Sequence, residues 1–152
     1  MIGFLIVLIT FILMECVTWL THRFVMHGTL WVLHEDHHQP RHNVFEKNDL
    51  FFLIFATPAI VLMWFGTHRE DSLWMFFLGT GITLYGFAYF VVHDIIIHQR
   101  FRLFTRWNNF YVRAIRKAHK VHHKNLGKED GECFGMLWVP MKYFREALRS
   151  QS

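Results

Sequence analysis

The sequence predicts an all-α integral membrane protein with three transmembrane helices. Hydrophobic residues make up 53% of the 152 residues, with 17 Phe and 6 Trp, which is more apolar surface than a soluble core of this size can bury. Three apolar runs are long enough to cross a hydrocarbon layer of roughly 30 Å, and they lie at residues 2–21, 50–66 and 73–92. The length fits a single domain over residues 1–152.

The first run is expected to be a retained membrane anchor. No basic region precedes it and no small-residue cleavage site follows it, so a signal peptide is not expected. From Ile2 to Leu20, only Thr10, Glu15 and Thr18 interrupt the apolar pattern. The second run follows "FEKND", which is expected to cap it. The hairpin "THREDS" joins it to the third run, and "HDIIIH" is expected to carry the third helix beyond the bilayer.

A fourth, interfacial helix is predicted after the third run. In "FRLFTRWNNFYVRAIRKA" apolar residues recur at helical spacing from Phe104 to Ala118, while Arg106, Arg113 and Arg116 take the other face. Such a pattern is typical of a helix that lies at the lipid headgroups. The loop "LGKEDGE" and a short helix in "PMKYFREALR" are expected to close the chain.

The distribution of positive charge predicts the orientation. Of the 16 Lys and Arg residues, 3 lie in residues 22–49, 12 lie in residues 93–152, and only Arg69 lies in the hairpin. Because basic loops stay in the cytoplasm, we expect a multi-pass protein of the inner (cytoplasmic) cell membrane with a cytoplasmic helical cap. Eleven of the twelve histidines then face the cytoplasm, and His68 alone lies across the membrane. The lipid bilayer is an expected partner, and nucleic acid is not.

Ten histidines form four clusters with two repeated spacings. Residues three and four apart share a helix face, so each His-x-x-His-His can direct its rings one way. Residues five apart diverge by about 140° on a straight helix, which suits two ions, or a bend such as Gly28 permits, better than one ion. The clusters are His22 and His27; His34, His37 and His38; His93 and His98; and His119, His122 and His123.

Ten imidazoles predict a dinuclear metal site in the cytoplasmic cap. A single zinc ion takes about four ligands, whereas two ions can share ten. Glu15, two helical turns before His22, either supports a ligand or bonds to a neighbouring helix. Asp36 and Asp94 are further candidates for orienting the histidine ligands. His42 and His68 are interpreted as ordinary surface histidines. A haem protein is disfavoured because no histidine interrupts an apolar run.

Ligand type alone leaves the metal open, because imidazole suits zinc, copper, iron and nickel. The four histidine phrases, in this order and spacing, resemble those of the membrane fatty-acid hydroxylase and sterol desaturase superfamily. Within it, "THRFVMHGTLWVLHEDHH", "HDIIIHQRF" and "AHKVHHKNLGKEDGECFG" look closest to the bacterial beta-carotene 3-hydroxylases. The resemblance runs from Glu15 to Glu146. Glu35-Asp36 departs from the Lys-Ser or Glu-Ser that members often carry.

The resemblance implies a monooxygenase of carotenoid biosynthesis. Two Fe²⁺ ions held by the ten histidines would use O₂, with electrons from ferredoxin or a similar reductant. They would hydroxylate the beta-ionone ring at C3, from beta-carotene through beta-cryptoxanthin to zeaxanthin. Phe24, Trp31 and Tyr89 would pack against the substrate. The alternatives are another lipid substrate (a sterol, a fatty acyl chain or a ketocarotenoid) and a non-catalytic metal-binding or transport protein. The basic face would dock an acidic carrier or attract anionic lipid.

Overall fold

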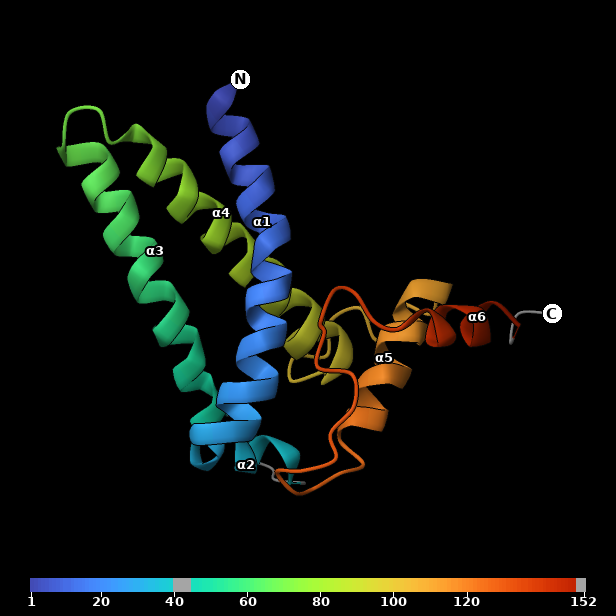
Figure 1. Cartoon of the computed structure of the whole chain (residues 1–152). Helices are drawn as coiled ribbons and strands as arrows, with labels where there is room; N and C mark the ends of the chain where they lie inside the picture. Colours follow the sequence, from blue (N-terminus) through green and yellow to red (C-terminus); the bar gives the residue numbers. More distant parts are fainter. Residues whose placement is uncertain (40–44, 150–152) are drawn as a thin grey trace.

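Three long helices dominate the computed structural model, which describes residues 1–39 and 45–149. All of the regular structure in these residues is helical, as the sequence predicts. The N-terminus and the α3–α4 hairpin lie at one end of the molecule, and α2 lies at the other (Figure 1). The three predicted spans are confirmed, with bounds that differ by a few residues: α1 (Ile2–Leu20), α3 (Leu50–His68) and α4 (Leu73–Phe90).

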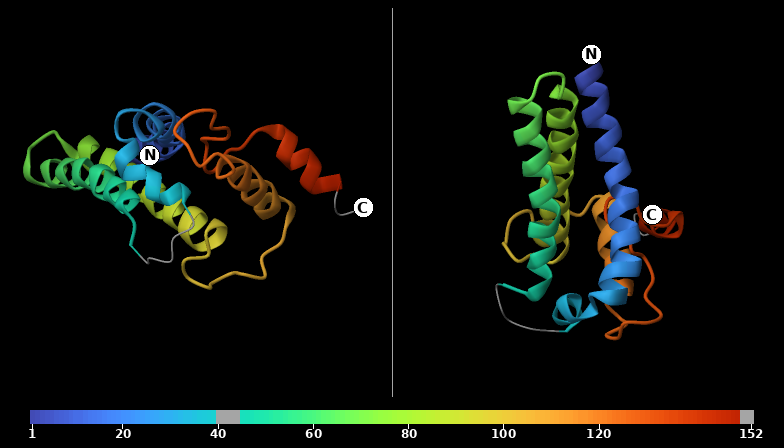
Figure 2. Two further views of the ribbon diagram at one scale, coloured as in Figure 1. Left: turned by 90° about the horizontal axis from the view of Figure 1, so that it is seen from below. Right: turned by 60° about the vertical axis from the view of Figure 1, so that its left-hand side comes forward.

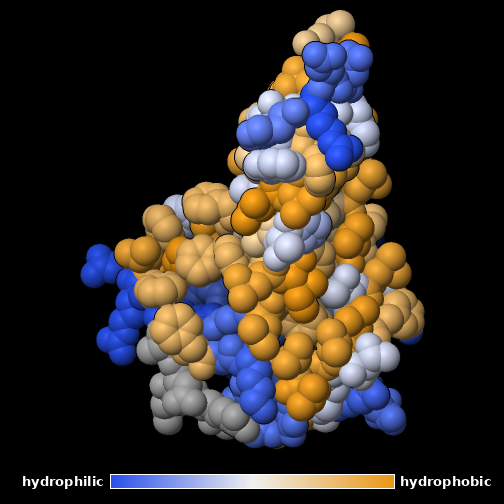
Figure 3. All heavy atoms as spheres, turned by 90° about the vertical axis from the view of Figure 1, so that its left-hand side faces the viewer, coloured by the Kyte–Doolittle hydropathy of each residue, from blue (hydrophilic) through white to orange (hydrophobic). Residues whose placement is uncertain are grey.

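Lipid must cover most of the surface of these helices. The candidate spans, extended by adjoining helical turns, are Ile2–Thr29, Lys47–His68 and Leu73–Ile97, and only 11% to 17% of their most apolar windows is buried inside the protein. Hydrophilic side chains gather at the hairpin tip and at the opposite end, with an apolar surface between them (Figure 3). Since so large an apolar surface is not stable in water, the chain is a membrane protein.

Glycines allow the spans to pack closely. A Cβ added at Gly79 would lie 2.6 Å from the carbonyl oxygen of Ala59 in α3, and one added at Gly81 would lie 2.6 Å from Cβ of Thr10 in α1. Small residues at helix contacts permit this approach in a bilayer, where apolar side chains gain nothing by leaving lipid. α4 therefore packs closely against both α1 and α3.

At the ends that adjoin the helical cap, α1 and α4 widen into π-helical segments, η1 (Thr21–Thr29) and η3 (Val91–Ile97). Leu30 N donates to Val25 O at 2.8 Å and His98 N to His93 O at 2.9 Å, both across five residues. In a π-helix, residue i+5 returns to the side of residue i, so the divergence expected for a straight helix does not occur. The chain also bends at Gly28, as expected (φ −120°, ψ −113°).

The cap contains the remaining short helices. The fourth predicted helix is present but begins later than expected, because the side chain of Asn109 accepts a hydrogen bond from Val112 N at 2.9 Å and starts α5 there. Phe104 has φ 56°, which does not belong to a helix. The predicted closing helix is confirmed. The bounds are α2 (Trp31–His38), η2 (Lys47–Asp49), α5 (Phe110–His122) and α6 (Met141–Arg149).

The small core of the cap ties it to the third span. α5 and α6 pack together beside the ends of α1 and α4 (Figure 2). Ile115 of α5 is completely buried, and Ile96 of η3 packs in the same cluster with Val139 and Tyr143. Arg116 donates to Ile96 O at 2.9 Å. These contacts place the end of α5 against η3.

Candidate metal centre

Nine of the ten clustered histidines converge into two adjacent groups. Within each group, one ring nitrogen per residue lies within 4.8 Å of the corresponding nitrogen of every other member. His123 lies beside the second group, with Nε2 2.8 Å from Nε2 of His119. The first histidine group is His22, His27, His34, His38 and His122, and the second histidine group is His37, His93, His98 and His119.

Each His-x-x-His-His phrase divides between the two groups, so the expectation that its three rings point one way is wrong. At 100° per residue, a residue four positions on lies about 40° to one side, and a residue three positions on about 60° to the other. His34 and His38 accordingly stay together while His37 joins the second group. In α5, His122 crosses to the first group in the same way.

The π-helical segments keep the other pairs together. His22 and His27 both belong to the first group, and His93 and His98 both belong to the second. On an α-helix these rings would point to different sides. Each group therefore receives one pair from a widened span end, one or two rings from α2, and at least one ring from α5.

Backbone carbonyls fix the orientation of four rings in the first group. A carbonyl oxygen can only accept, so each Nδ1 carries the proton and Nε2 presents a lone pair to the centre of the group. The Nδ1–carbonyl oxygen pairs are His22 with Phe134 O (3.0 Å), His27 with Lys128 O (3.1 Å), His38 with Asn125 O (2.9 Å) and His122 with Glu132 O (2.7 Å).

Side-chain oxygens orient three more rings. The fifth ring of the first group, that of His34, has Nδ1 2.7 Å from Oδ1 of Asn48. In the second group the acceptors are carboxylates: Nδ1 of His37 lies 2.7 Å from Oε2 of Glu46. Nδ1 of His93 lies 3.2 Å from Oδ2 of Asp94.

Each group brings its ring nitrogens close enough together to hold a metal ion, and the distances within the first group match those of metal ligands. In the first group, facing Nε2 atoms are 3.1 to 3.3 Å apart, and unprotonated lone pairs at that distance repel unless a cation lies between them. Two nitrogens at about 2.1 Å from one ion, at angles of about 90° to 109°, are roughly 3.0 to 3.4 Å apart. Neutral imidazole is a ligand that transition metals prefer.

Burial keeps several of these rings neutral. It lowers the pKa of His38 to about 4, of His34 to about 2 and of His122 to about 3. Burial and the neighbouring imidazoles hold the pKa of His119 well below its usual range. Protons therefore do not compete for the ring nitrogens near neutral pH.

The three carboxylates expected to support ligands take different positions. Oδ2 of Asp94 contacts His93, as described. Oδ2 of Asp36 accepts from Lys47 N at 2.8 Å. Glu15 accepts from the backbone amides of Met136, Leu137 and Trp138 at 2.9 to 3.2 Å, and from the hydroxyl of Tyr85 at 2.6 Å. Glu15 thus holds the segment that carries Phe134 O, the acceptor of His22.

Two of the three predicted substrate aromatics lie against the histidines. The Trp31 ring is 5.1 Å from that of His27 in the first group, and the Tyr89 ring is 4.9 Å from that of His93 in the second. Phe24 is 58% exposed and packs edge-on with Trp19. Sequence reasoning missed Phe134, whose ring lies 5.2 to 5.4 Å from three rings of the first group.

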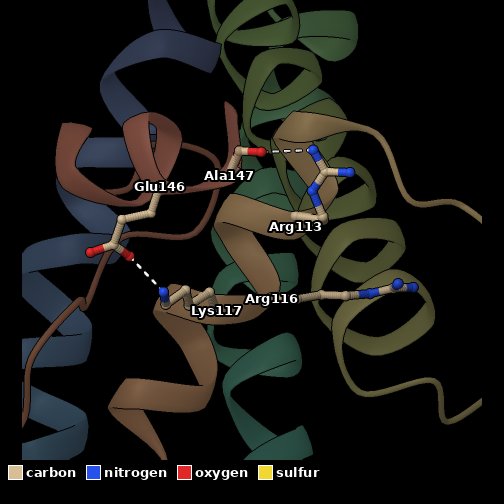
Figure 4. Close-up of a pocket in the computed structure, with 5 residues that line it drawn as sticks. All are labelled: Arg113, Arg116, Lys117, Glu146 and Ala147. Carbon is tan, nitrogen blue, oxygen red and sulfur yellow. Dashed lines mark hydrogen bonds and ion pairs between the residues drawn. The ribbon is translucent and has the colours of Figure 1, made fainter. Parts of the chain in front are cut away.

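His68 and a cavity between α5 and α6 lie apart from the histidine groups. His68 stacks on Trp64 in the distant hairpin, and His42 is outside the described residues. A shallow cavity of about 320 Å³ lies between α5 and α6. Charged side chains that line this cavity join the two helices. Lys117 forms an ion pair with Glu146, and Arg113 donates to the carbonyl oxygen of Ala147 (Figure 4).

The apolar spans and the paired sets of inward-facing imidazoles define a membrane-bound, metal-binding class of protein. A family model described as fatty acid hydroxylase matches residues 7–143, and the chain belongs to this family. It is therefore an enzyme, an oxidoreductase that hydroxylates its substrate. No solved structure is detectably similar to the chain.

Its relatives include several named beta-carotene hydroxylases. The protein of Pseudescherichia vulneris is 40% identical over 140 residues, which cover 91% of this chain and 78% of the relative. That of Pantoea ananas is 41% identical, covering 90% and 77%. The chloroplastic beta-carotene hydroxylase 1 of Capsicum annuum is 40% identical over 78% of this chain and 38% of its own length.

Proposed function

We propose that this protein is a di-iron, O₂-dependent hydroxylase of the beta-ionone ring of beta-carotene. It hydroxylates C3 at each end, from beta-carotene to beta-cryptoxanthin to zeaxanthin, in carotenoid biosynthesis. The observation that carries the proposal is the convergence of ten imidazoles at the end of lipid-exposed helices. The similarity to beta-carotene hydroxylases over about nine-tenths of the chain supports the substrate.

The ten clustered histidines, His123 included, are proposed to hold two iron ions. Bound iron would supply the activation of O₂ and the oxidation of an unactivated C–H bond. The protein's part is to keep each Nε2 unprotonated and directed inward through the acceptors at Nδ1. Because each group uses residues from both halves of the chain, we propose that residues 1–152 act as one domain.

Aromatic side chains are proposed to place the substrate ring. Trp31 lies against the first histidine group and Tyr89 against the second. An open groove of about 800 Å³ beside α1 is lined by Trp19, Phe134 and Trp138 among others. Since Phe134 contacts the first group, this groove offers an apolar molecule a route from the lipid. Phe24, exposed next to Trp19, is proposed to contact the polyene outside the centre.

Electrons are proposed to come from a ferredoxin-type carrier. Lys120, Lys124 and Lys128 are exposed on the cap. Lys120 adjoins His119 in the sequence, and Lys128 O accepts from His27. An acidic carrier attracted to these lysines would dock close to both groups. The excess of Lys and Arg on this side supports placement of the centre at the cytoplasmic face of the inner membrane.

Pigment analysis tests the proposal. Bacterial cells that accumulate beta-carotene and express the chain, together with a ferredoxin system, are expected to form beta-cryptoxanthin and zeaxanthin, which chromatography resolves. His37→Ala and His122→Ala, one ligand from each group, are expected to abolish conversion. His68→Ala, in the distant hairpin, serves as the matched control and is expected to convert normally.

Unreacted beta-carotene beside an iron-loaded, reduced protein would count against the carotenoid substrate. The same preparation would then be offered a sterol, a fatty acyl lipid and a ketocarotenoid. Hydroxylation of one of these would identify that lipid as the substrate in place of beta-carotene, while the proposed hydroxylation chemistry would stand. Ion flux into vesicles without oxygen consumption would instead indicate a transport protein.

A further inference from the structure

The two histidine groups differ in what orients their rings. In the first group, backbone carbonyls accept from four Nδ1 atoms and the neutral amide of Asn48 lies at the fifth. In the second group, the carboxylates of Glu46 and Asp94 lie at Nδ1 of His37 and His93. A carboxylate that accepts the hydrogen bond from Nδ1 raises the basicity of Nε2 more than a neutral acceptor does. The imidazole is then a stronger metal ligand.

A chain of hydrogen bonds joins the two carboxylates that support the second group. Nη1 of Arg100 donates to Oδ1 of Asp94 at 2.6 Å and to Oδ1 of Asp49 at 2.8 Å, and Nη2 donates to Oδ2 of Asp49 at 2.9 Å. Oδ2 of Asp49 accepts from the backbone N of Glu46 at 3.0 Å. The supports of His37 and His93 therefore share one guanidinium.

These charged groups are largely withdrawn from solvent. The exposed fractions of the side chains are 20% for Arg100, 11% for Asp94, 17% for Glu46 and 33% for Asp49. The bonds to Asp49 and Asp94 raise the pKa of Arg100 above its usual value. Buried ion pairs with several hydrogen bonds hold one geometry, and loss of one partner leaves an uncompensated charge. Arg100 thus bonds to Asp94 directly and is linked to the backbone of Glu46 through Asp49.

We propose that Arg100 is a positioning residue which, by fixing Asp94 and the Asp49–Glu46 turn, makes the second histidine group the stronger metal site, so that the two bound ions are inequivalent. This inference rests on the proposed function, because it requires both groups to bind iron. The difference between the two ions comes from the carboxylates of Glu46 and Asp94 and from Arg100, which links them by way of Asp49.

Metal retention and Mössbauer spectra test the inference without any activity measurement. Wild-type protein loaded anaerobically with ⁵⁷Fe²⁺ is expected to hold two ions in two spectral environments, one of which a chelator removes more slowly. Arg100→Gln is expected to weaken retention of that slow ion by about 10- to 100-fold, the usual effect of losing a group that orients a ligand. Arg100→Lys, which keeps the charge but not the double bridge, is expected to be intermediate.

Background variants assign the effect to one group. In His122→Ala, which impairs the first group, Arg100→Gln is expected to make the remaining ion labile. In His98→Ala, which impairs the second group, the same substitution is expected to change nothing. Non-additivity of this kind identifies residues that act on the same site. Arg102→Gln, exposed two residues away, is the matched control and is expected to match wild type.

The outcomes separate this inference from the proposed function. A wild-type chain that binds no iron would count against the function. Two wild-type ions that leave at equal rates with one spectrum, or an Arg100→Gln protein indistinguishable from wild type, would overturn the inference alone. If Arg100→Gln does not fold, Arg100→Lys decides: wild-type retention of both ions in that folded variant would also overturn it.

Discussion

At the scale of single residues, the acceptor at Nδ1 decides which nitrogen of each ring faces the centre of its histidine group. Most acceptors in the first group are main-chain carbonyls, which no side-chain substitution can delete. His34 is different, because its acceptor is the side chain of Asn48, 2.7 Å away. His34 is also 1% exposed, so water does not reach Nδ1 to replace the amide. Asn48 is thus the position where the orientation of a first-group ring can be tested directly.

Asn48→Ala is expected to lower the affinity of the first group for iron by about 10- to 100-fold, because the His34 ring loses the acceptor that fixes its tautomer. Iron per chain after a chelator challenge measures this. Asn108→Ala is the matched control, since Asn108 is exposed just before α5. Equal retention in the two variants would contradict the role given to Asn48.

The spacing of the histidines predicted which residues converge, but it could not predict what surrounds them. Glu46 lies in "FEKND", which was interpreted only as a helix cap. The side chain of Glu46 does form a capping box with Asp49, and it also bonds to His37. Phe134 lies in an irregular loop with no periodicity to mark it. The contacts of Glu46 and Phe134 with the histidines depend on how the loops fold back onto α1. No local pattern in a single sequence indicates that folding.

At the scale of elements, the widened ends of α1 and α4 were not predictable from the sequence. The apolar runs predicted both helices and nearly their full lengths. On a straight α-helix the two residues of a His-x4-His pair point apart, and a bend near Gly28 is the one local signal that they could meet. The π-helical hydrogen bonds across five residues are set by the packing of the ends, and no residue type marks them. The division of the His-x-x-His-His phrases, by contrast, follows from the α-helical turn itself, which sets residues three and four positions on to opposite sides of the first.

Helix packing in the bilayer gives a prediction for α4. Gly81→Ala would place a Cβ 2.6 Å from that of Thr10, which is too close, so α1 must shift at a cost of about 1–3 kcal/mol. The midpoint of unfolding in detergent is expected to fall. Gly86→Ala, in the same helix with nothing within 4 Å of the new Cβ, is the control and is expected to be neutral or slightly stabilising. Equal midpoints would show that α1 does not pack there.

At the scale of the whole molecule, the hairpin and the cap are expected to face opposite sides of the membrane. In a chain whose native Cys16 and Cys133 are replaced by serine, a cysteine at Glu70 is expected to react with an impermeant maleimide added outside intact spheroplasts. A cysteine at Lys128 is expected to react only after lysis, since basic segments stay in the cytoplasm. Labelling of both sites from outside would contradict the three-span orientation.

The surface of the cap also predicts how the electron carrier binds. Changing Lys120, Lys124 and Lys128 to glutamate is expected to raise the KM for ferredoxin roughly 10-fold or more at low salt, with kcat little changed, because like charges now repel. The effect is expected to diminish at high salt, where screening is stronger. Lys142→Glu, in α6, is the control. An unchanged KM in the triple variant would exclude this surface as the docking site.

His37 and His122 each belong to a different histidine group from other members of the same His-x-x-His-His phrase. This division has a consequence for how the protein is made. While the ribosome is still translating the second span, the second group has only His37, and the first group lacks His122 until α5 emerges. Complete coordination sets therefore arise only after all three spans are inserted and the cap has folded back onto them. Binding of the proposed ions then becomes a late step of biogenesis, and a truncated or misinserted chain would not carry both histidine groups complete.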